Sequence, residues 1–400
     1  MRPASGTFVS TDLLRTLLAS LEAEMPEAIS LRERLHASPE PSNAEHGTAR
    51  LVAQALGAGD IEPVAGTGLV CRVGPHRGRA VAVRAELDAL PIREQTGAPF
   101  AARGDFMHAC GHDVHMAALA ALFRAARRSE DSLAGSMLAL YQPSEESHPS
   151  GAEVISRQLV PGERVGAFVA AHVHPEVPWG SVSVEPGPVN ASCDHLRIIV
   201  EGLGGHGAYP HRTRDPILAL SHIVVALQAL VGRRLDPTHP GVLSVGRIHA
   251  GSADNVIPEV AEAGGTLRAL NPEDREPLRE AAREIVETTA RLHGCAARVE
   301  VAKGEPATVN DAAIASAARA LAPEAGFELA PPLISCGSDD FGFYGLLAPT
   351  LMVFVCLDGA PGTGRLPLHH PRFLPPPEAV RMVARAQAVA FAAASTRREG

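Results

Sequence analysis

The densest group of reactive side chains lies between residues 107 and 115, which contain three histidines, one cysteine and one aspartate. A single glycine separates Cys110 from His112, and it lets the backbone turn so that a thiolate and an imidazole can face one centre. Sulfur and imidazole together suit zinc or a neighbouring divalent metal. Asp88 or Asp113 could orient a ligand imidazole through a hydrogen bond. A surface loop that caps the following helix is the alternative, and the crowding of reactive residues favours the metal site.

A second group consists of two adjacent acids, Glu145 and Glu146, which follow an apolar run of strand character. Neighbouring acids at a strand end can face different partners. One carboxylate can then bind a metal while the other accepts and returns a proton. Pairs of glutamates are also common on solvated surfaces, so the position after the strand is what favours chemistry here.

Two isolated histidines extend the predicted ligand set. His172 ends an apolar run, and His369 follows a loop rich in glycine and proline. Either one alone is more often structural than ligating. Taken together they fit a site at which several strand ends each supply one ligand, as is usual at the carboxyl edge of an α/β sheet. His174 and His370 lie next to them and compete for the ligand role.

Strands and helices alternate along the chain around these residues. Short apolar runs predict strands at 81–87, 136–141 and 167–173, and helical spacing predicts a helix at 116–128 and another over 11–37, interrupted near Pro26. A helix at 311–321, a strand at 350–356 and a closing helix from 377 come later. This alternation predicts a three-layer α/β catalytic domain with a mainly parallel sheet, in which reactive groups gather at the carboxyl ends of the strands.

The pattern differs between residues 188 and 307. Its predicted elements follow the order β-α-β-β-α-β, with strands at 195–201, 242–250, 261–270 and 297–301 and helices at 216–233 and 273–293. That order is typical of a ferredoxin-like α+β domain. We therefore expect residues 188–307 to form a lid or dimerisation domain inserted into a catalytic domain made of residues 1–187 and 308–400.

Composition excludes several function classes. A chain of 400 residues is too long for a single small binding module. The net charge of -9 without long runs of one sign gives no support for a nucleic-acid or anionic-membrane partner. The six cysteines are widely spaced, which favours reduced thiols and a cytoplasmic location. The most apolar stretch, 346–357, contains a proline and is too short to span a membrane.

The chain resembles the aminoacylase-type amidohydrolases of the dinuclear zinc peptidase superfamily, in the branch of hippurate hydrolases, auxin-conjugate hydrolases and N-acyl amino acid deacylases. The motifs that carry the resemblance lie at 32–40, 84–91, 108–113, 142–146, 204–208, 255–258, 265–268, 337–341 and 367–369. Two positions depart from the family pattern. Glu86 stands where the family usually has Asp, and His370 stands where it usually has Asn or Ser.

The resemblance implies two divalent ions per subunit, zinc first, with manganese or cobalt as alternatives. The ligands that it implies are Cys110, His112, Glu146, His172 and His369. It assigns the general base to Glu145 and the oxyanion donor to His206, which would come from the partner subunit of a homodimer formed through the inserted domain. Asn255 and Arg268 would bind the free carboxylate of the substrate. Without the resemblance, His206 would be interpreted as a turn residue among glycines and Arg268 as a solvated strand end.

The implied reaction is hydrolysis of the amide bond of an N-acyl amino acid, which releases a carboxylic acid and a free amino acid. A dinuclear exopeptidase, or a deacetylase of a diaminopimelate-like intermediate, shares the metal chemistry. A non-catalytic dimeric binding protein predicts a broken ligand set, and the set here is complete. A cysteine-nucleophile hydrolase using Cys110 and His112 predicts ready alkylation and no effect of metal removal. The acyl group, the amino acid and the metal stay open at this point.

Overall fold

The computed structural model describes residues 5–57, 60–75, 79–158, 165–361 and 365–395, with side chains from residue 11 onward. The chain forms two compact units. The larger unit contains residues 1–187, 309–333 and 343–400, and the smaller unit contains residues 188–308 and 334–342. Residues 1–4 and 396–400 of the predicted catalytic domain lie outside the described residues. Among the residues that are described, no helix is both long and apolar enough to span a bilayer.

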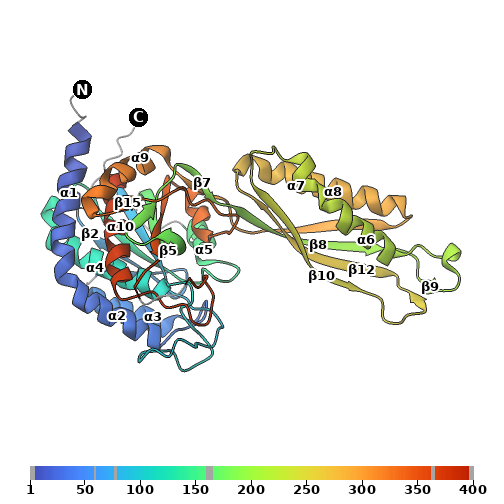
Figure 1. Ribbon diagram of the computed structural model, residues 1–400, viewed down its shortest axis with the longest axis horizontal. Helices are drawn as coiled ribbons and strands as arrows, with labels where there is room; N and C mark the ends of the chain where they lie inside the picture. Colours follow the sequence, from blue (N-terminus) through green and yellow to red (C-terminus); the bar gives the residue numbers. More distant parts are fainter. Residues whose placement is uncertain (1–4, 58–59, 76–78, 159–164, 362–364, 396–400) are drawn as a thin grey trace. The chain divides into compact units, whose positions relative to one another are not determined.

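A mainly parallel sheet forms the centre of the larger unit (Figure 1). Its central strands lie in the order β4 (Met137–Gln142), β3 (Ala80–Glu86), β5 (Val165–Pro178) and β16 (Thr350–Asp358), and all of these pairs are parallel. β2 (Gly68–Val73) and β1 (Ile61–Val64) extend the sheet beyond β4 in antiparallel fashion. The remaining short strands are β6 (Ser181–Ser183), β7 (Gly187–Asn190), β14 (Thr308–Asn310) and β15 (Glu328–Leu329).

The strand register determines which reactive residues lie side by side on neighbouring strands. Glu86 at the end of β3 pairs with Gln142 at the end of β4. Arg84 pairs with Ala170, so Glu86 also stands level with His172 on β5. Because the carboxyl ends of parallel strands meet at one edge, the side chains that follow these strands converge there.

Alanine-rich helices cover the sheet. α4 (His112–Arg128) and α10 (Glu378–Ser395) contact each other and the central strands, and both are largely buried. Their many alanines allow this close packing, because small side chains let helix backbones approach. The other helical segments of the chain's larger part are α1 (Ser5–Leu21), η1 (Glu22–Glu24), α2 (Met25–Ala37), α3 (His46–Leu56), η2 (Glu130–Ser132), α5 (Gly151–Gln158), α9 (Ala312–Leu321), η5 (Ala322–Ala325) and η6 (Asp340–Leu346).

Three element boundaries differ from those predicted from sequence. α4 begins at His112 rather than 116, because Gly111 ends the preceding turn in the left-handed region with φ of 88°. The first helix breaks at 22–24, and Pro26 then lies in the first turn of α2, where its missing N–H costs nothing. β5 continues past His172 to Pro178, because β16 pairs with it along that extra length.

The smaller unit has the predicted ferredoxin-like topology. Its antiparallel sheet has the order β10 (Gly241–Ala250), β12 (Val260–Ala269), β8 (Ser192–Glu201) and β13 (Ala296–Lys303). The segments around these strands are α6 (Pro216–Leu227), α7 (Ala229–Arg234), α8 (Arg275–Leu292), η3 (Pro210–Arg212), η4 (Pro272–Asp274) and the short pair β9 (Gly205–His206) and β11 (Val256–Ile257). Ile198 and Val200 of β8 pack with Ile223 of α6 and Val286 of α8 in the core. The α/β fold class with an inserted α+β domain is therefore confirmed.

Candidate metal centre

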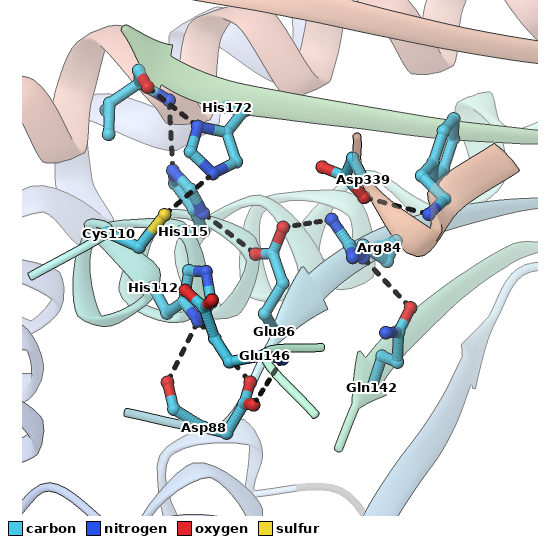
Figure 2. Close-up of polar contacts among 12 residues, drawn as sticks. Arg84, Glu86, Asp88, Cys110, His112, His115, Gln142, Glu146, His172 and Asp339 are labelled. Atoms are coloured by element: carbon cyan, nitrogen blue, oxygen red, sulfur yellow. Dashed lines mark hydrogen bonds and ion pairs between the residues drawn. The ribbon is translucent and has the colours of Figure 1, made fainter. Parts of the chain in front are cut away.

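Three of the predicted ligands meet where α4 begins and β5 passes the ends of β3 and β4. Cys110, His112 and His172 are all buried, and their ligand atoms lie within 4.8 Å of one another. The Cys110 Sγ atom is 3.5 Å from the His172 Nε2 atom (Figure 2). The capping-loop alternative for residues 107–115 is wrong, because this whole segment is buried rather than on the surface.

Gly111 is required for this arrangement. A Cβ atom at this position would lie 2.5 Å from Val173 Cγ2, which is far inside van der Waals contact. The φ of 88° also lies in the region that side chains other than glycine avoid. A glycine therefore lets the chain reverse between Cys110 and His112 while it passes closely over β5.

The two adjacent acids lie in the loop after β4. The ligand atoms of His112, Glu145 and Glu146 lie within 4.8 Å of one another. Ser144 precedes the acids with a positive φ of 52°, a strained conformation for a residue with a side chain. The buried carboxylate of Glu45 holds it in place by accepting the Ser144 backbone N–H at 2.8 Å. Sequence reasoning missed Glu45, because nothing near it in sequence pointed to the loop that it supports.

His369 reaches the same region from the loop before α10. Its backbone N–H donates to the Ala109 carbonyl at 2.8 Å, and its φ is 66°. Its Nε2 atom is 3.4 Å from Glu146 Oε1. Cys110, Glu146 and His369 form a further group whose ligand atoms lie within 4.8 Å of one another. All five predicted ligands thus lie in three overlapping groups. Any two of these groups have one member in common, which is Cys110, His112 or Glu146.

The competing histidines make local hydrogen bonds instead. His174 Nδ1 accepts the Glu176 N–H at 3.3 Å, and His370 Nδ1 accepts the Arg372 N–H at 3.1 Å. Within the described residues, neither of them belongs to a group with metal-ligand spacing.

The residues present fit a metal ion. His112 Nε2 and Glu146 Oε1 are buried and have no hydrogen-bond partner among the described residues. Buried polar atoms rarely lack a hydrogen bond, so these two atoms suit a positive ion to which each would donate a lone pair. Burial alone would lower the pKa of His112, but Asp88, Glu86 and Glu146 outweigh it and raise this pKa to about 10. The same negative surroundings would attract a divalent cation.

Asp88 positions two of the predicted ligands. Its side chain accepts the Glu146 backbone N–H at 2.9 Å and the Ser42 hydroxyl at 2.7 Å. Its backbone carbonyl lies 2.9 Å from His112 Nδ1. Because a carbonyl can only accept, the proton of neutral His112 is on Nδ1, and Nε2 carries the lone pair that a metal needs.

Asp113 is placed differently from the sequence-based expectation of a contact with a ligand imidazole. Its Oδ2 atom accepts from Arg32 Nε at 2.7 Å and lies 2.8 Å from His36 Nδ1. His36 Nε2 lies 3.2 Å from Glu94 Oε1, so His36 bridges two carboxylates in the protein interior. This bridge joins α2 to α4 and to the loop that carries Glu94.

The buried His36 bridge predicts a loss of stability at alkaline pH. Burial of the imidazole would lower its pKa, but Asp113 and Glu94 outweigh this and raise the pKa of His36 from 6.5 to about 9. A pKa raised by folding contributes stability that is fully present below pH 6.5 and is lost as the pH rises through 9. The contribution is on the order of 3 kcal/mol. Urea unfolding of chelator-treated protein from pH 6 to 10 measures it.

The matched variant is His36→Gln, which keeps hydrogen-bonding capacity but cannot be charged. We expect it to be less stable than the wild type at pH 6 and to approach the wild type at pH 10, because only the wild type can lose a proton from His36, whereas His112 titrates in both proteins. Stability curves of the two proteins that run parallel across the whole range would contradict the assignment of His36 as the titrating group.

The predicted substrate residues lie in the smaller unit. His206 is exposed on β9, next to Val256 of β11, and the Asn255 carbonyl accepts the Gly207 N–H at 2.8 Å. Arg268 on β12 donates to the Cys336 carbonyl at 3.0 Å. His206 and Asn255 are therefore neighbours, whereas Arg268 lies on β12 of the separate four-stranded sheet.

Comparison with known proteins identifies the family. The model of peptidase family M20/M25/M40 matches residues 82–390, most of the chain. The chain belongs to this family. The M20 chain is 34% identical over 361 residues to an N-acetyl-L-cysteine deacetylase of Bacillus subtilis, covering 89% of this chain and 84% of that one. The resemblance and the assignment as a hydrolase are thereby confirmed.

Two further relatives bear on the site of this M20 protein. It is 32% identical over 370 residues to an N-acetyldiaminopimelate deacetylase of Exiguobacterium sibiricum, covering 90% of this chain and 97% of that one. It is also similar to the solved structure of a dinuclear metal-binding M20 peptidase from Bacillus subtilis. The TM-score is 0.80 at 31% identity, and the match covers 93% of this chain and 98% of that chain.

Proposed function

We propose that this M20 hydrolase cleaves the amide bond of N-acyl amino acids at a dinuclear metal centre, releasing a carboxylic acid and a free amino acid. The observation that carries the proposal is the convergence of five metal-ligand side chains and Glu145 at one edge of the sheet. The deacetylase names of two relatives, each similar over most of the chain, support the same substrate class.

The ligand types indicate which metals fit. Cys110, His112 and His172 would hold one ion, and Cys110, Glu146 and His369 would hold the other. Thiolate and imidazole favour zinc, while manganese and cobalt are compatible with the imidazole and carboxylate ligands. When bound, the ions would polarise the amide carbonyl and lower the pKa of a water molecule.

Glu145 performs the proton transfers in this proposal. Its carboxylate lies beside the predicted ligands His112 and Glu146. From there it accepts a proton from the attacking water and delivers it to the nitrogen of the leaving amine. Asp88 holds the backbone of Glu146, and Glu45 holds that of Ser144, so the two acids keep fixed places relative to each other.

The substrate contacts require a second copy of the chain. In the register of β8 and β12, Arg268 pairs with Cys193, whereas Val260 pairs with Glu201 at the other end of the sheet. Eight residues of strand span about 26 Å. His206 lies beyond that other end, on β9 (Figure 1). In an N-acyl amino acid only the α-carbon and the amide nitrogen separate the carboxylate from the scissile carbonyl. One substrate molecule therefore cannot contact His206 and Arg268 of the same subunit.

A surface of the smaller unit is suited to pairing with that second copy. β10 is an edge strand of the sheet, and its residues 246–250 are exposed. α6 contacts β10 and exposes Leu218 and Val225, the latter with 73% of its surface accessible. An unpaired strand edge beside exposed apolar side chains favours association. A homodimer through the inserted domain would cover both and bring His206 of one subunit to the substrate of the other.

Three other functions make different predictions. A deacetylase of diaminopimelate-like intermediates would use the same metal centre, and the Exiguobacterium relative supports it as the second candidate. A cysteine-nucleophile hydrolase would use Cys110 and His112, but Cys110 is only 7% exposed and lies amid predicted metal ligands. A non-catalytic binding protein has no need for the complete ligand set.

Removal of metal tests the proposal directly. Free amine release is measured for N-acetyl, N-benzoyl and longer N-acyl amino acids, with N-acetyldiaminopimelate in the same panel. We expect chelation to reduce hydrolysis at least about 1,000-fold, because both the activated water and the carbonyl polarisation are lost. Adding back zinc, manganese or cobalt should restore activity and rank the metals.

The control is alkylation of the metal-loaded and the chelated protein with iodoacetamide. We expect metal to protect Cys110 from alkylation. Activity that survives chelation and is lost on alkylation would overturn the proposal in favour of a cysteine nucleophile. Hydrolysis of N-acetyldiaminopimelate alone would favour the biosynthetic deacetylase, and metal binding without hydrolysis of any substrate would favour a binding protein.

A further inference from the structure

Glu86 ends β3 beside the predicted metal ligands but is not one of the five. Its side chain is 2% exposed and forms a close ion pair with Arg84. Its other oxygen lies 2.8 Å from His115 Nδ1 (Figure 2). Burial would raise the pKa of Glu86, but Arg84 and His115 outweigh it and hold this pKa well below the usual value. The carboxylate is therefore charged, and its two oxygens contact Arg84 and His115.

His115 uses both of its ring nitrogens. Its Nε2 atom accepts the backbone N–H of Val173 at 3.1 Å. Since that nitrogen must carry a lone pair, the proton of neutral His115 is on Nδ1 and is donated to Glu86. Glu86, His115 and His172 also have metal-ligand spacing. In this arrangement, however, His115 has no nitrogen left to bind a metal.

The backbone of Val173 also contacts the predicted ligand His172. Its carbonyl lies 2.7 Å from His172 Nδ1, and a carbonyl can only accept. His172 therefore carries its proton on Nδ1, and its Nε2 atom presents a lone pair toward Cys110, 3.5 Å away. Both polar groups of the Val173 backbone are thus bonded to histidines, whose ring centroids lie 4.5 Å apart.

We propose that Glu86 and His115 are positioning residues that fix the backbone of β5 at Val173, and through it the tautomer and direction of the metal ligand His172. The chain of contacts runs from Arg84 through Glu86, His115 and the Val173 peptide to the imidazole of His172. Groups that orient ligand imidazoles commonly change metal affinity by 10- to 100-fold when they are removed. This role rests on the metal centre of the proposed function and assigns no ligand to Glu86.

The test compares metal affinity among single and double variants. His115→Gln keeps the Arg84–Glu86 pair and is the milder change, and Glu86→Gln removes the charge at nearly constant volume. We expect each variant to bind two ions at saturation, with affinity for zinc lowered about 10- to 100-fold in competition with a chromophoric chelator. The double variant should lose little more than either single variant, because both changes break one chain of contacts.

A matched control separates this role from a general loss of stability. Asp194→Asn removes a buried carboxylate that accepts from Arg275 and Arg279 in the smaller unit. We expect it to lower the melting temperature of the metal-free protein while zinc affinity stays unchanged. Glu86→Gln should lower both.

Three results would overturn the inference. Zinc affinity like that of the wild type in both single variants would show that the chain of contacts does not position His172. Binding of only one ion by Glu86→Gln would make Glu86 a ligand. Fully additive losses in the double variant would mean that Glu86 and His115 act independently. Absence of metal in the wild type is a different result, because it would refute the proposed metal centre itself.

Discussion

The Glu145→Gln variant is expected to bind both metal ions and to lose hydrolysis. The substitution keeps the shape of the side chain in the loop after β4 but removes the group that accepts and returns the proton. Positioned general bases contribute about 100- to 10,000-fold to rate, so we expect kcat to fall within this range while KM changes little. Amine release from the best N-acyl amino acid, measured on fully metal-loaded protein, provides the value.

Glu146→Gln is the control for this prediction. Its carboxylate lies in the same loop but belongs to the group formed with Cys110 and His369. We expect the Glu146 variant to bind metal more weakly and to recover part of its activity at high metal concentration. The Glu145 variant should not respond to added metal. A Glu145→Gln protein that keeps activity within a few-fold of wild type would show that another group is the base.

The second large effect is expected when two inactive variants share one dimer. His206→Ala should lower kcat by about 100- to 1,000-fold, since it removes a donor to the oxyanion. If His206 acts across the subunit interface, a heterodimer of His206→Ala and Glu145→Gln contains one complete site. We expect it to have about half of the wild-type activity, because a twofold-symmetric dimer has two equivalent sites. Purification through two different affinity tags isolates the heterodimer.

A second heterodimer is expected to give the opposite result. One subunit carries both substitutions and the other is wild type. If His206 acts in trans, neither site is complete and activity is lost. If His206 acts within its own subunit, the wild-type subunit remains active and the first heterodimer is the inactive one. The separation of His206 on β9 from Arg268 near the end of β12 favours the trans arrangement.

Much of the fold followed from local patterns in the sequence. Apolar runs of strand length and helical spacings are set by neighbouring residues, so they indicated β3, β4, β5 and the order of elements in the ferredoxin-like unit. The boundaries that differed depend on partners distant in sequence. β5 extends to Pro178 only because β16 pairs with it there, and no property of residues 174–178 alone signals a strand.

The candidate site, like the fold, could be predicted only in part from the sequence. Residue types and motif spacing determined which side chains could bind metal, because thiolate, imidazole and carboxylate chemistry belongs to the residues themselves. The structural role of Gly111 could also be predicted from the sequence, because a chain reversal between two ligands needs a residue without a Cβ atom. The sequence could not determine the left-handed conformations of Ser144 and His369, because residues other than glycine only uncommonly have a positive φ. Contacts such as the bond from Ser144 to Glu45 hold them there.

Tertiary structure alone decided what each buried charge contacts. Asp113 stands next to His112 in sequence yet bonds to Arg32 and His36, because successive residues at the start of a helix point in different directions. Glu86 likewise bonds to His115, which lies 29 positions further along the chain. A hydrogen bond requires two atoms within about 3 Å in the right direction. Only the packing of helices on the sheet, and not the order of residues along the chain, sets such distances.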